Sequence, residues 1–383
     1  MIRLICILLW LLPLPAFAAG GMMPDIVFAA PNVSAPAYTG PGDIVASATA
    51  WYGLRAYSSS QVAGTTKAVN LRRASDNTTC DFDINTSGNL GGTDAGCGTG
   101  TGLSLATFAT QDATATCTIA TNSASCVSAS STPHAGSTIT GAGVTNPCYA
   151  ISVGTFTGGS GTVTLGGNVA GSPCGTIGAG VTLTFTYGLF VPEWYDQTGN
   201  GHHLIQATAG NQFELLPNCL ASLPCLSQTT TTQTEVTSAT FTPTAVGTLY
   251  NVTFNLANGA ANAGMLLENG SNNRLRITGA AATWSILGGA SGSIVANASN
   301  AAFHVAIGVL NGASSVLSID GTSTTGTATG NTTAGTIGFG TNGNPNSLRY
   351  TEAGVWDTVA FTSGNLTSLC HNAFTYWGTS TSC

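Results

Sequence analysis

The sequence predicts an all-β protein, and three features carry that prediction. Short runs in which apolar and polar residues alternate recur along the chain, among them GTVTLGG, TLYNVTFNL and SVLSIDG. Each run is bounded by Gly, Asn, Ser or Thr clusters, which is typical of antiparallel strands and their turns. Long stretches with helical periodicity are almost absent. The exceptions are a predicted helical turn near 103–109 and a short predicted helix in the C-terminal TSLCHNAFTYWG.

The first 18 residues have the pattern of a cleaved signal peptide. Arg3 precedes an apolar run, and Ala16 and Ala18 flank Phe17 in the small-x-small order that signal peptidases cut. The apolar run is too short to span a bilayer, and no later stretch approaches that length. We therefore expect an exported protein, either secreted or at the periplasm or cell surface, with no membrane partner.

The charge balance excludes one class of partner. Without Arg3 the chain carries 7 basic and 15 acidic side chains, a net charge of −8, and charged residues make up only 6% of the sequence. Nucleic acids and anionic membranes attract basic proteins. The surface predicted here is instead polar and uncharged, so neither is an expected partner.

Eleven cysteines indicate a disulfide framework. One of them, Cys6, lies in the predicted signal peptide, and an even number remains, as expected of an exported disulfide-bonded chain. Their clustering favours pairing between sequence neighbours: 80–97, 117–126, 148–174, 219–225 and 370–383. Because no C-x-x-C pair exists, neither a metal site nor a cofactor is predicted.

A change of composition divides the mature chain into three parts. Residues 111–188 hold four cysteines and many Gly-Ser-Thr turns, with Asp112 as their single acidic residue. We interpret this part as a small disulfide-pinned β insertion. It interrupts a larger β domain, whose first part spans 19–110 and whose remainder spans 189–383.

The segment EWYDQTGNGHHLIQA, residues 193–207, is the most densely specified part of the chain. It combines two carboxylates and two histidines with a Gly-Asn-Gly turn. Asp196 followed by Gln-Thr-Gly-Asn-Gly suits a tight turn, in which the carboxylate caps backbone N–H groups and the glycines take positive φ. Glu193, His202 and His203 are interpreted as surface groups, although histidine titrates in the range that acid–base catalysis needs.

Two segments together resemble the catalytic domain of glycoside hydrolase family 54, the α-L-arabinofuranosidase B family. They are LRRASDNTTCDFDI and WYDQTGNGHHLIQA, and a weaker match is TIGFGTNGNPNSLRYTEAGVW. The resemblance covers about 50–110 and 188–375. It implies a two-sheet jelly-roll β-sandwich of the concanavalin A/laminin G type. It also implies retaining hydrolysis of terminal arabinofuranosyl residues, which needs two carboxyl groups about 5 Å apart.

The resemblance places the catalytic groups downstream, where this sequence departs from the family pattern. Glu268 is the candidate nucleophile, although it precedes an Asn-Gly where the family's Glu follows one. Asn342 stands where the family has its acid/base Asp, and an amide cannot exchange the required proton. Asn269, Trp284 and Asn342 are candidate substrate-binding residues, while Glu352, in the apolar YTEAGVW, suggests a structural hydrogen-bonding role.

Three functions remain open from the sequence. The first is an exported arabinofuranosidase-like hydrolase that acts on arabinose-containing polysaccharide or oligosaccharide, with degraded catalytic positions. The second is a carbohydrate-binding or adhesive protein on the same fold, since fold alone does not fix function. The third is an exported structural protein. The low charge and the Gly- and Thr-rich β-strand sequences favour this interpretation.

Overall fold

The structure is a computed structural model of the chain. It describes residues 37–62, 65–94, 97, 102–109, 111–120, 122–134, 137–144, 148–167, 174–186, 188–220, 223–228, 233–237, 240–255, 263–268, 273–278, 283–289, 292–297, 302–339, 348–379 and 383. The chain divides into two compact units, Met1–Ala37 and Tyr38–Cys383. The predicted signal peptide lies outside the described residues, and every described helix and strand belongs to the second unit.

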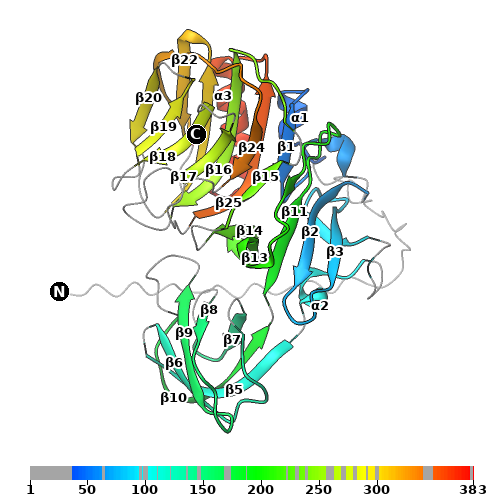
Figure 1. The fold of residues 1–383 in the computed structure, drawn as a ribbon, viewed down its shortest axis with the longest axis vertical. Coiled ribbons are helices and arrows are strands. Elements are labelled where there is room, and N and C mark those ends of the chain that lie inside the picture. Colours follow the sequence, from blue (N-terminus) through cyan, green and yellow to red (C-terminus); the bar gives the residue numbers. More distant parts are fainter. Residues whose placement is uncertain are drawn as a thin grey trace, which may run out of the picture. The chain divides into compact units, whose positions relative to one another are not determined.

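Nineteen strands form one hydrogen-bonded network, which confirms the all-β prediction (Figure 1). The first half contains β1 (Ala50–Gly53), β2 (Lys67–Arg73), β3 (Thr79–Ile84), β4 (Leu90–Thr93), β11 (Leu189–Trp194), β12 (Leu204–Ile205), β13 (Phe213–Leu220), β14 (Leu223–Gln228) and β15 (Glu235–Thr237). The second half contains β16 (Gly247–Asn255), β17 (Ala263–Glu268), β18 (Asn273–Thr278), β19 (Thr283–Leu287), β20 (Ser293–Asn297), β21 (Phe303–Leu310), β22 (Gly312–Ile319), β23 (Thr322–Ala328), β24 (Thr336–Phe339) and β25 (Leu348–Asp357).

The network folds into layers that pack face to face. Strands β18 and β19 contact β21 without pairing to it, β18 also contacts β16, and β19 also contacts β22. One large apolar core joins strands from both sides, and Trp194, Trp284 and Tyr350 are fully buried in it. This arrangement is consistent with the predicted β-sandwich. The jelly-roll topology stays a prediction.

Strand register fixes which side chains share a face. Trp194 pairs with Val69 of β2 and with Leu204 of β12, and all three are buried. The neighbouring position, Glu193, pairs with Asn70 and with Ile205, which are only partly buried or exposed. Because alternate residues point to opposite faces, β11 presents Trp194 to the core and Glu193 to the outer face.

Strands β5 to β10 form a separate closed barrel (Figure 1). They are β5 (Gln111–Ala120), β6 (Ser123–Val127), β7 (Thr138–Gly141), β8 (Cys148–Val153), β9 (Gly161–Gly167) and β10 (Ile177–Thr186). The barrel has its own apolar core, which includes Ile119, Leu165 and Phe185. All six strands lie within the predicted insertion, 111–188, whose separability as a domain stays a prediction.

Deletion of the insertion is expected to leave the rest of the chain folded. Gln111, at the start of β5, pairs directly with Thr186, at the end of β10. Paired residues of neighbouring strands lie about 5 Å apart, so a short Gly-Ser linker closes the gap without moving the flanking strands. The shortened chain should unfold in one cooperative transition in urea. Loss of cooperative unfolding would show that the barrel belongs to the main core.

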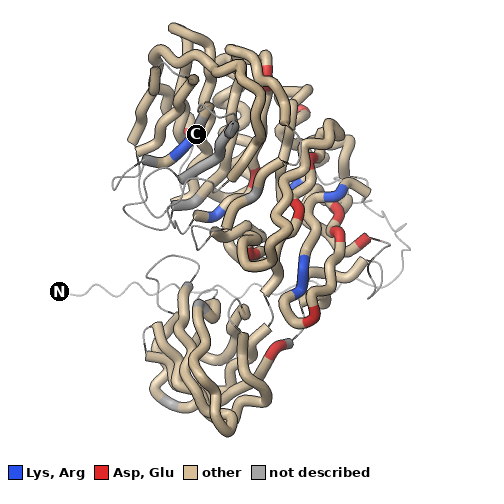
Figure 2. The backbone as a smooth tube through the Cα atoms, in the orientation of Figure 1, with Lys and Arg blue, Asp and Glu red and all other residues tan. Residues whose placement is uncertain are grey.

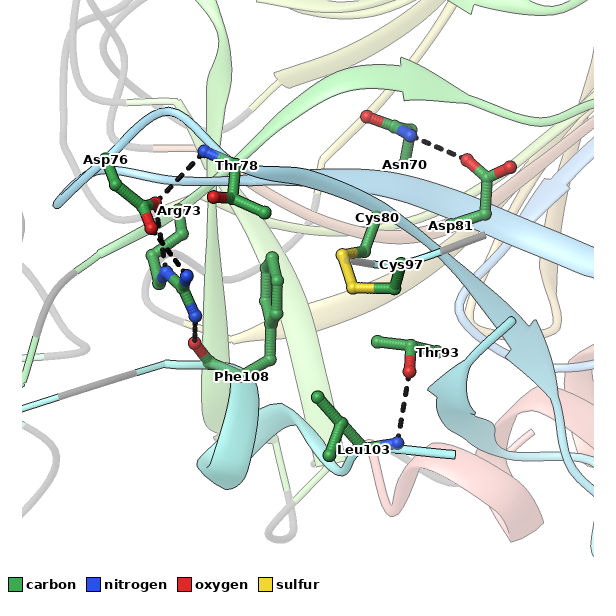
Figure 3. The surroundings of a disulfide bond; sticks show 10 residues. All are labelled: Asn70, Arg73, Asp76, Thr78, Cys80, Asp81, Thr93, Cys97, Leu103 and Phe108. Carbon is green, nitrogen blue, oxygen red and sulfur yellow. Dashed lines mark hydrogen bonds and ion pairs between the residues drawn. A yellow bond between two sulfur atoms is a disulfide. The ribbon is translucent and has the colours of Figure 1, made fainter. Parts of the chain in front are cut away.

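The five predicted disulfides are all present. They join Cys80–Cys97, Cys117–Cys126, Cys148–Cys174, Cys219–Cys225 and Cys370–Cys383. Figure 3 shows the first of them, between β3 and the loop after β4. The closed loops span 6 to 26 residues, for which chain-entropy arguments give stabilisation on the order of 2–4 kcal/mol per bond.

Among the described residues, three α-helices and two 3₁₀ turns accompany the strands, and α3 is the longest of them. They are α1 (Pro41–Ile44), α2 (Leu105–Phe108), α3 (Ser363–Trp377) and the 3₁₀ turns η1 (Ser59–Gln61) and η2 (Ala209–Asn211). The predicted helical turn near 103–109 and the predicted C-terminal helix correspond to α2 and α3. Thr362 caps α3 by accepting from the Asn365 N–H, and Gly378 ends it at φ 60°, a left-handed conformation that favours glycine.

Charged side chains are sparse along the fold, as Figure 2 shows. In the part of the chain that the structure describes, no helix is long and apolar enough to cross a membrane.

Candidate functional site

The turn after β11 is held by the carboxylate of Asp196. One of its oxygens, Oδ1, accepts hydrogen bonds from the Trp51 N–H at 3.1 Å and from the Thr198 N–H at 3.0 Å. The other, Oδ2, accepts from the His202 N–H at 3.1 Å. The Thr198 hydroxyl adds a fourth bond at 2.7 Å. A carboxylate that is 5% exposed and bound in this way is a cap for backbone N–H groups.

The next residues fasten the same turn to β1. Gln197 donates from Nε2 to the carbonyls of Gly53 and Arg55, and its Oε1 accepts from the Tyr57 N–H at 2.9 Å. Asn200 donates from Nδ2 to the carbonyl of Thr49 at 3.0 Å. These contacts join segments about 145 residues apart in the sequence, so the turn ties two distant parts of the sandwich together.

The remaining features of this segment have structural roles as well. Gly199 and Gly201 take φ values of 83° and 78°, which glycine adopts without strain. The His203 ring accepts the Asp196 N–H at Nδ1, at 3.0 Å. The prediction that this segment is a scaffold turn rather than a catalytic centre agrees with every one of these contacts.

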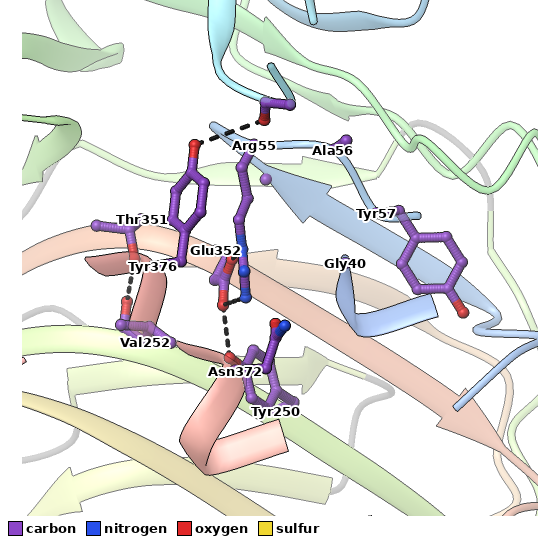
Figure 4. A network of polar contacts seen from close by, with 12 residues as sticks. Gly40, Arg55, Ala56, Tyr57, Tyr250, Val252, Thr351, Glu352, Asn372 and Tyr376 are labelled. Carbon is purple, nitrogen blue, oxygen red and sulfur yellow. Dashed lines mark hydrogen bonds and ion pairs between the residues drawn. The ribbon is translucent and has the colours of Figure 1, made fainter. Parts of the chain in front are cut away.

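Glu352 lies in a buried ion pair with Arg55 (Figure 4). The guanidinium donates from Nε at 2.5 Å and from Nη2 at 2.8 Å, and the Tyr250 hydroxyl donates to Glu352 Oε1 at 2.5 Å. Both charged side chains are fully buried, and the Tyr376 ring stacks 4.6 Å from the guanidinium carbon. Burial opposes the charge of Arg55, but Glu352 outweighs it, so the pKa of the guanidinium is raised. The predicted structural role of Glu352 is confirmed.

A polar network lies on the outer face of β11, β2 and β3. Asp81 accepts from the Asn70 amide at 2.6 Å, from the Tyr195 hydroxyl at 2.7 Å and from Lys67. Burial opposes the charge of Asp81, but these bonds outweigh it and lower its pKa. Burial raises the pKa of Glu193. One carboxyl group with a lowered pKa beside another with a raised pKa is the pattern of a catalytic base and acid. Both oxygens of Asp81 already accept hydrogen bonds, however, so Asp81 is not free to act as the base.

Register separates Glu193 from the predicted nucleophile. A path of paired residues crosses from β11 through β12, β15 and β24 to β17. Its members are Glu193, Ile205, Val236, Gly338 and Leu266, and the last lies two residues before the nucleophile position. Four strand spacings of about 4.8 Å make roughly 19 Å. A retaining pair needs its carboxyl groups about 5 Å apart, so Glu193 does not serve as the proton donor for a nucleophile at position 268.

Glu214 is an unusual carboxyl group that the sequence did not reveal. Through Ser227 of β14, strand register places it on the same face as Arg349 of β25. Burial raises the pKa of Glu214 to about 8, and the positive charge of Arg349 offsets this only in part. Arg349 is 4% exposed, and burial lowers its pKa to about 10. The sequence around Glu214, FELLPN, indicates neither the burial of this carboxyl group nor its closeness to Arg349.

Glu214 should make stability depend on pH. Folding raises the pKa of Glu214, so between about pH 4.5 and 8 its carboxyl group is protonated in the folded chain and ionised in the unfolded chain. Stability therefore falls as pH rises through this window, on the order of 5 kcal/mol over its full width. The variant Glu214→Gln should remove most of this decline. Urea unfolding at pH 5 and pH 9 measures it, and an equal decline in both proteins would contradict the assignment.

The predicted site residues are described only in part. Glu268 ends β17 and pairs with Thr336 of β24, whereas Asn269 and Asn342 lie outside the described residues. Phe339, the last described residue before Asn342, is three residues along β24 from Thr336, a distance of about 10 Å. The chain after Phe339 must therefore turn back for position 342 to meet Glu268, and both roles stay predictions.

Trp284 is described, and its ring lies in the core. It is 1% exposed and makes an edge contact with His304 at a centroid distance of 6.3 Å. In this structure the ring offers no face on which a sugar can stack, because the opposite layer covers it. Among the described residues no group of three or more His, Cys, Asp or Glu side chains could hold a metal ion.

No family model matches the chain, and no curated protein matches its sequence. Solved structures do match it. One is an arabinofuranosidase complexed with arabinofuranosyl-α-1,2-xylobiose, at 15% identity and a TM-score of 0.47. Another is a glycoside hydrolase family 54 α-L-arabinofuranosidase soaked with a cyclic sulfate inhibitor, at 14% identity and a TM-score of 0.49. Each match covers 87% of this chain and 64% of the other. The chain thus spans less than two thirds of the length of the arabinofuranosidase structures to which it is similar.

Proposed function

We propose that this chain is an exported carbohydrate-active protein of the arabinofuranosidase type. It recognises terminal arabinofuranosyl groups of a polysaccharide or oligosaccharide. Glu268 is the nucleophile of a retaining mechanism, and Asn269 and Asn342 contribute to the substrate site. Trp284, also predicted to bind substrate, is left out because its ring is buried in the core. The disulfides and the signal peptide predicted for 1–18 fit a protein that works outside the cytoplasm.

One observation supports this proposal most. The segment that carries the resemblance, 195–204, makes a specific junction in which the side chains of Asp196, Gln197 and His203 each have a hydrogen-bond partner. Asp196 caps three backbone N–H groups, Gln197 binds the backbone of β1 and its flank, and His203 accepts the Asp196 N–H. Such a match reflects a shared structural requirement, because composition alone does not produce this set of side chains in this order.

The proposed hydrolysis is slow, because the proton donor is missing. Asn342 stands at the position that the resemblance assigns to the acid/base carboxyl group, and an amide N–H is too weakly acidic to protonate a leaving group near neutral pH. Two of the described carboxylates are unsuited to replace it. Glu352 is locked to Arg55, and Asp196 is locked in its turn. A binding protein without turnover is the alternative function on the same fold.

Kinetics on 4-nitrophenyl α-L-arabinofuranoside test the proposal. The wild-type chain should release nitrophenol slowly, and Glu268→Gln should reduce kcat at least about 100-fold, because the glycosyl-enzyme bond cannot form. The matched control is Glu193→Gln, which removes a carboxyl group roughly 19 Å away along the sheet and should leave kcat unchanged.

Two other outcomes are informative. Equal rates in the wild type and in Glu268→Gln would show that Glu268 is not the nucleophile. No release by either protein, together with saturable binding of an arabinofuranosyl oligosaccharide, would support the binding alternative.

A further inference from the structure

A polar cleft lies beside the turn that follows β11. Its volume is about 540 Å³, within the range of small-molecule sites. Two neighbouring segments, 47–49 and 57–61, and the distant segment 198–200 line it. The lining side chains are hydroxyls, amides and one alanine: Ser47, Ala48, Thr49, Tyr57, Ser58, Ser60, Gln61, Thr198 and Asn200. None of the described residues that line the cleft belongs to β17.

The walls of this cleft are fixed in place. Tyr57 accepts from the Ala48 N–H and donates to the Val45 carbonyl, each at 3.0 Å. Asn200 donates to the carbonyls of Ala48 and Thr49. These bonds lock the segments together before any ligand arrives, and a preformed site avoids the entropy cost of ordering its walls on binding.

Two polar groups of the cleft have no hydrogen-bond partner among the described residues. The Ser47 hydroxyl and the Asn200 amide oxygen make no hydrogen bond within the described structure. Ser58 and Ser60 share a single hydroxyl–hydroxyl bond at 2.8 Å, which leaves one donor and three acceptor positions between them. The cleft therefore presents both donors and acceptors at fixed positions.

Ser47 has an unusual backbone conformation. Its φ is 62°, in the left-handed region that L residues other than Asn, Asp and Gly rarely adopt. Glycine would take this conformation more easily, so Ser47→Gly removes the hydroxyl without straining the backbone. The residue is exposed and lines the cleft, so its hydroxyl is available to a ligand.

The lining also restricts the charge of the ligand. None of the described residues that line the cleft is a Lys, Arg, Asp or Glu. The nearby Asp43 is engaged by the N–H groups of Gly40 and Ser59 and by the Ser59 hydroxyl. With no cation to meet an acid and no free anion to meet a base, the site suits a ligand that is rich in hydroxyl groups and uncharged.

We infer that this cleft is a second carbohydrate site, which binds a neutral oligosaccharide away from the hydrolytic position. Ser47, Ser58, Ser60 and Asn200 contact the sugar hydroxyls. The inference deepens the proposed function, on which it rests for the class of ligand. According to this inference, the cleft holds a neutral arabinan-type chain while the hydrolytic position processes a sugar side chain. Uronic-acid polymers are excluded as ligands.

Calorimetric titration of the mature chain with α-1,5-arabinopentaose tests the inference, and pentagalacturonate serves as the charged comparison. The variant Ser47→Gly should bind the neutral sugar about tenfold more weakly, the loss expected for one hydrogen bond. Its Tm should equal or exceed that of the wild type, because glycine relieves the backbone at this position. Ser60→Trp, which fills an exposed part of the cleft, should abolish binding.

The chain offers a matched control. Ser128 is also an exposed serine in the left-handed region, with φ 52°, and it lies at the end of β6 in the barrel. Ser128→Gly should leave binding unchanged. Wild-type affinity in both Ser47→Gly and Ser60→Trp would overturn the inference, as would a wild-type chain that does not bind arabinopentaose or that prefers pentagalacturonate.

The two proposals fail in different ways. If Ser47→Gly weakens binding of arabinopentaose while Glu268→Gln leaves nitrophenol release unchanged, the cleft stands and the proposed nucleophile does not. If Glu268→Gln stops release while Ser47→Gly and Ser60→Trp bind normally, the proposed function stands and the second site does not.

Discussion

Glu352→Gln is expected to destabilise the protein by about 3–5 kcal/mol, the cost of removing one partner of a buried ion pair. Arg55 and Glu352 are both fully buried, and two guanidinium nitrogens and the Tyr250 hydroxyl donate to the carboxylate. A glutamine amide replaces one acceptor oxygen by an NH₂ group. The buried charge of Arg55 then has no counter-charge, and a donor faces a donor.

Urea unfolding at neutral pH measures the effect, and a surface ion pair supplies the control. Lys67 Nζ lies 3.7 Å from Asp94 Oδ2, and the two side chains are 45% and 26% exposed. Asp94→Asn should cost no more than about 1 kcal/mol, because solvent already screens the pair. A loss for Glu352→Gln as small as that of the control would show that the buried pair is not a main determinant of stability.

A double variant separates the pair from its packing. Arg55→Met combined with Glu352→Leu removes both charges and keeps most of the volume. It should recover much of the stability lost in Glu352→Gln, because well-packed apolar residues often replace a buried ion pair at little cost. A double variant as unstable as the single one would point to loss of packing around Tyr250 and Tyr376 rather than to the unpaired charge.

The features that the sequence predicted correctly are local. Alternation of apolar and polar residues needs only a few neighbours, and it located strands such as β9 and β16 to within a residue. The disulfides could be paired because each closes a loop of at most 26 residues. The role of Asp196 followed from its own turn, since Asp followed by Gly-Asn-Gly specifies how the backbone bends.

The features that the sequence missed depend on long-range register. Arg55 and Glu352 are 297 residues apart, so nothing near either residue identifies its partner. Glu214 and Arg349 share a face only because β13, β14 and β25 pair in one particular register. Trp284 alternates like a residue of a half-exposed strand, but the opposite layer covers it. Alternation shows which residues share a face, and not what packs against that face.

Asn342→Asp is expected to raise hydrolysis of arabinofuranosides by roughly 10²–10⁴-fold, the usual contribution of a general acid. The substitution restores a carboxyl group where the resemblance places the proton donor. The gain requires that the chain after Phe339 turns back toward β17, because a retaining pair works at about 5 Å. The matched control is Asn344→Asp, which adds the same charge two residues away and should leave the rate unchanged.

The size of the gain should depend on the leaving group, and this dependence identifies the mechanism. Nitrophenolate leaves readily without a proton, whereas methoxide does not, so protonation matters most for methyl α-L-arabinofuranoside. If Asp at position 342 acts as the acid, Asn342→Asp accelerates the methyl glycoside more than the nitrophenyl glycoside. Equal acceleration of both substrates would indicate that the new carboxylate improves substrate positioning only. No acceleration of either would place the proton donor, or the whole hydrolytic site, elsewhere in the chain. In that case the neutral-sugar cleft beside Ser47 would be the first place to look for the biological activity.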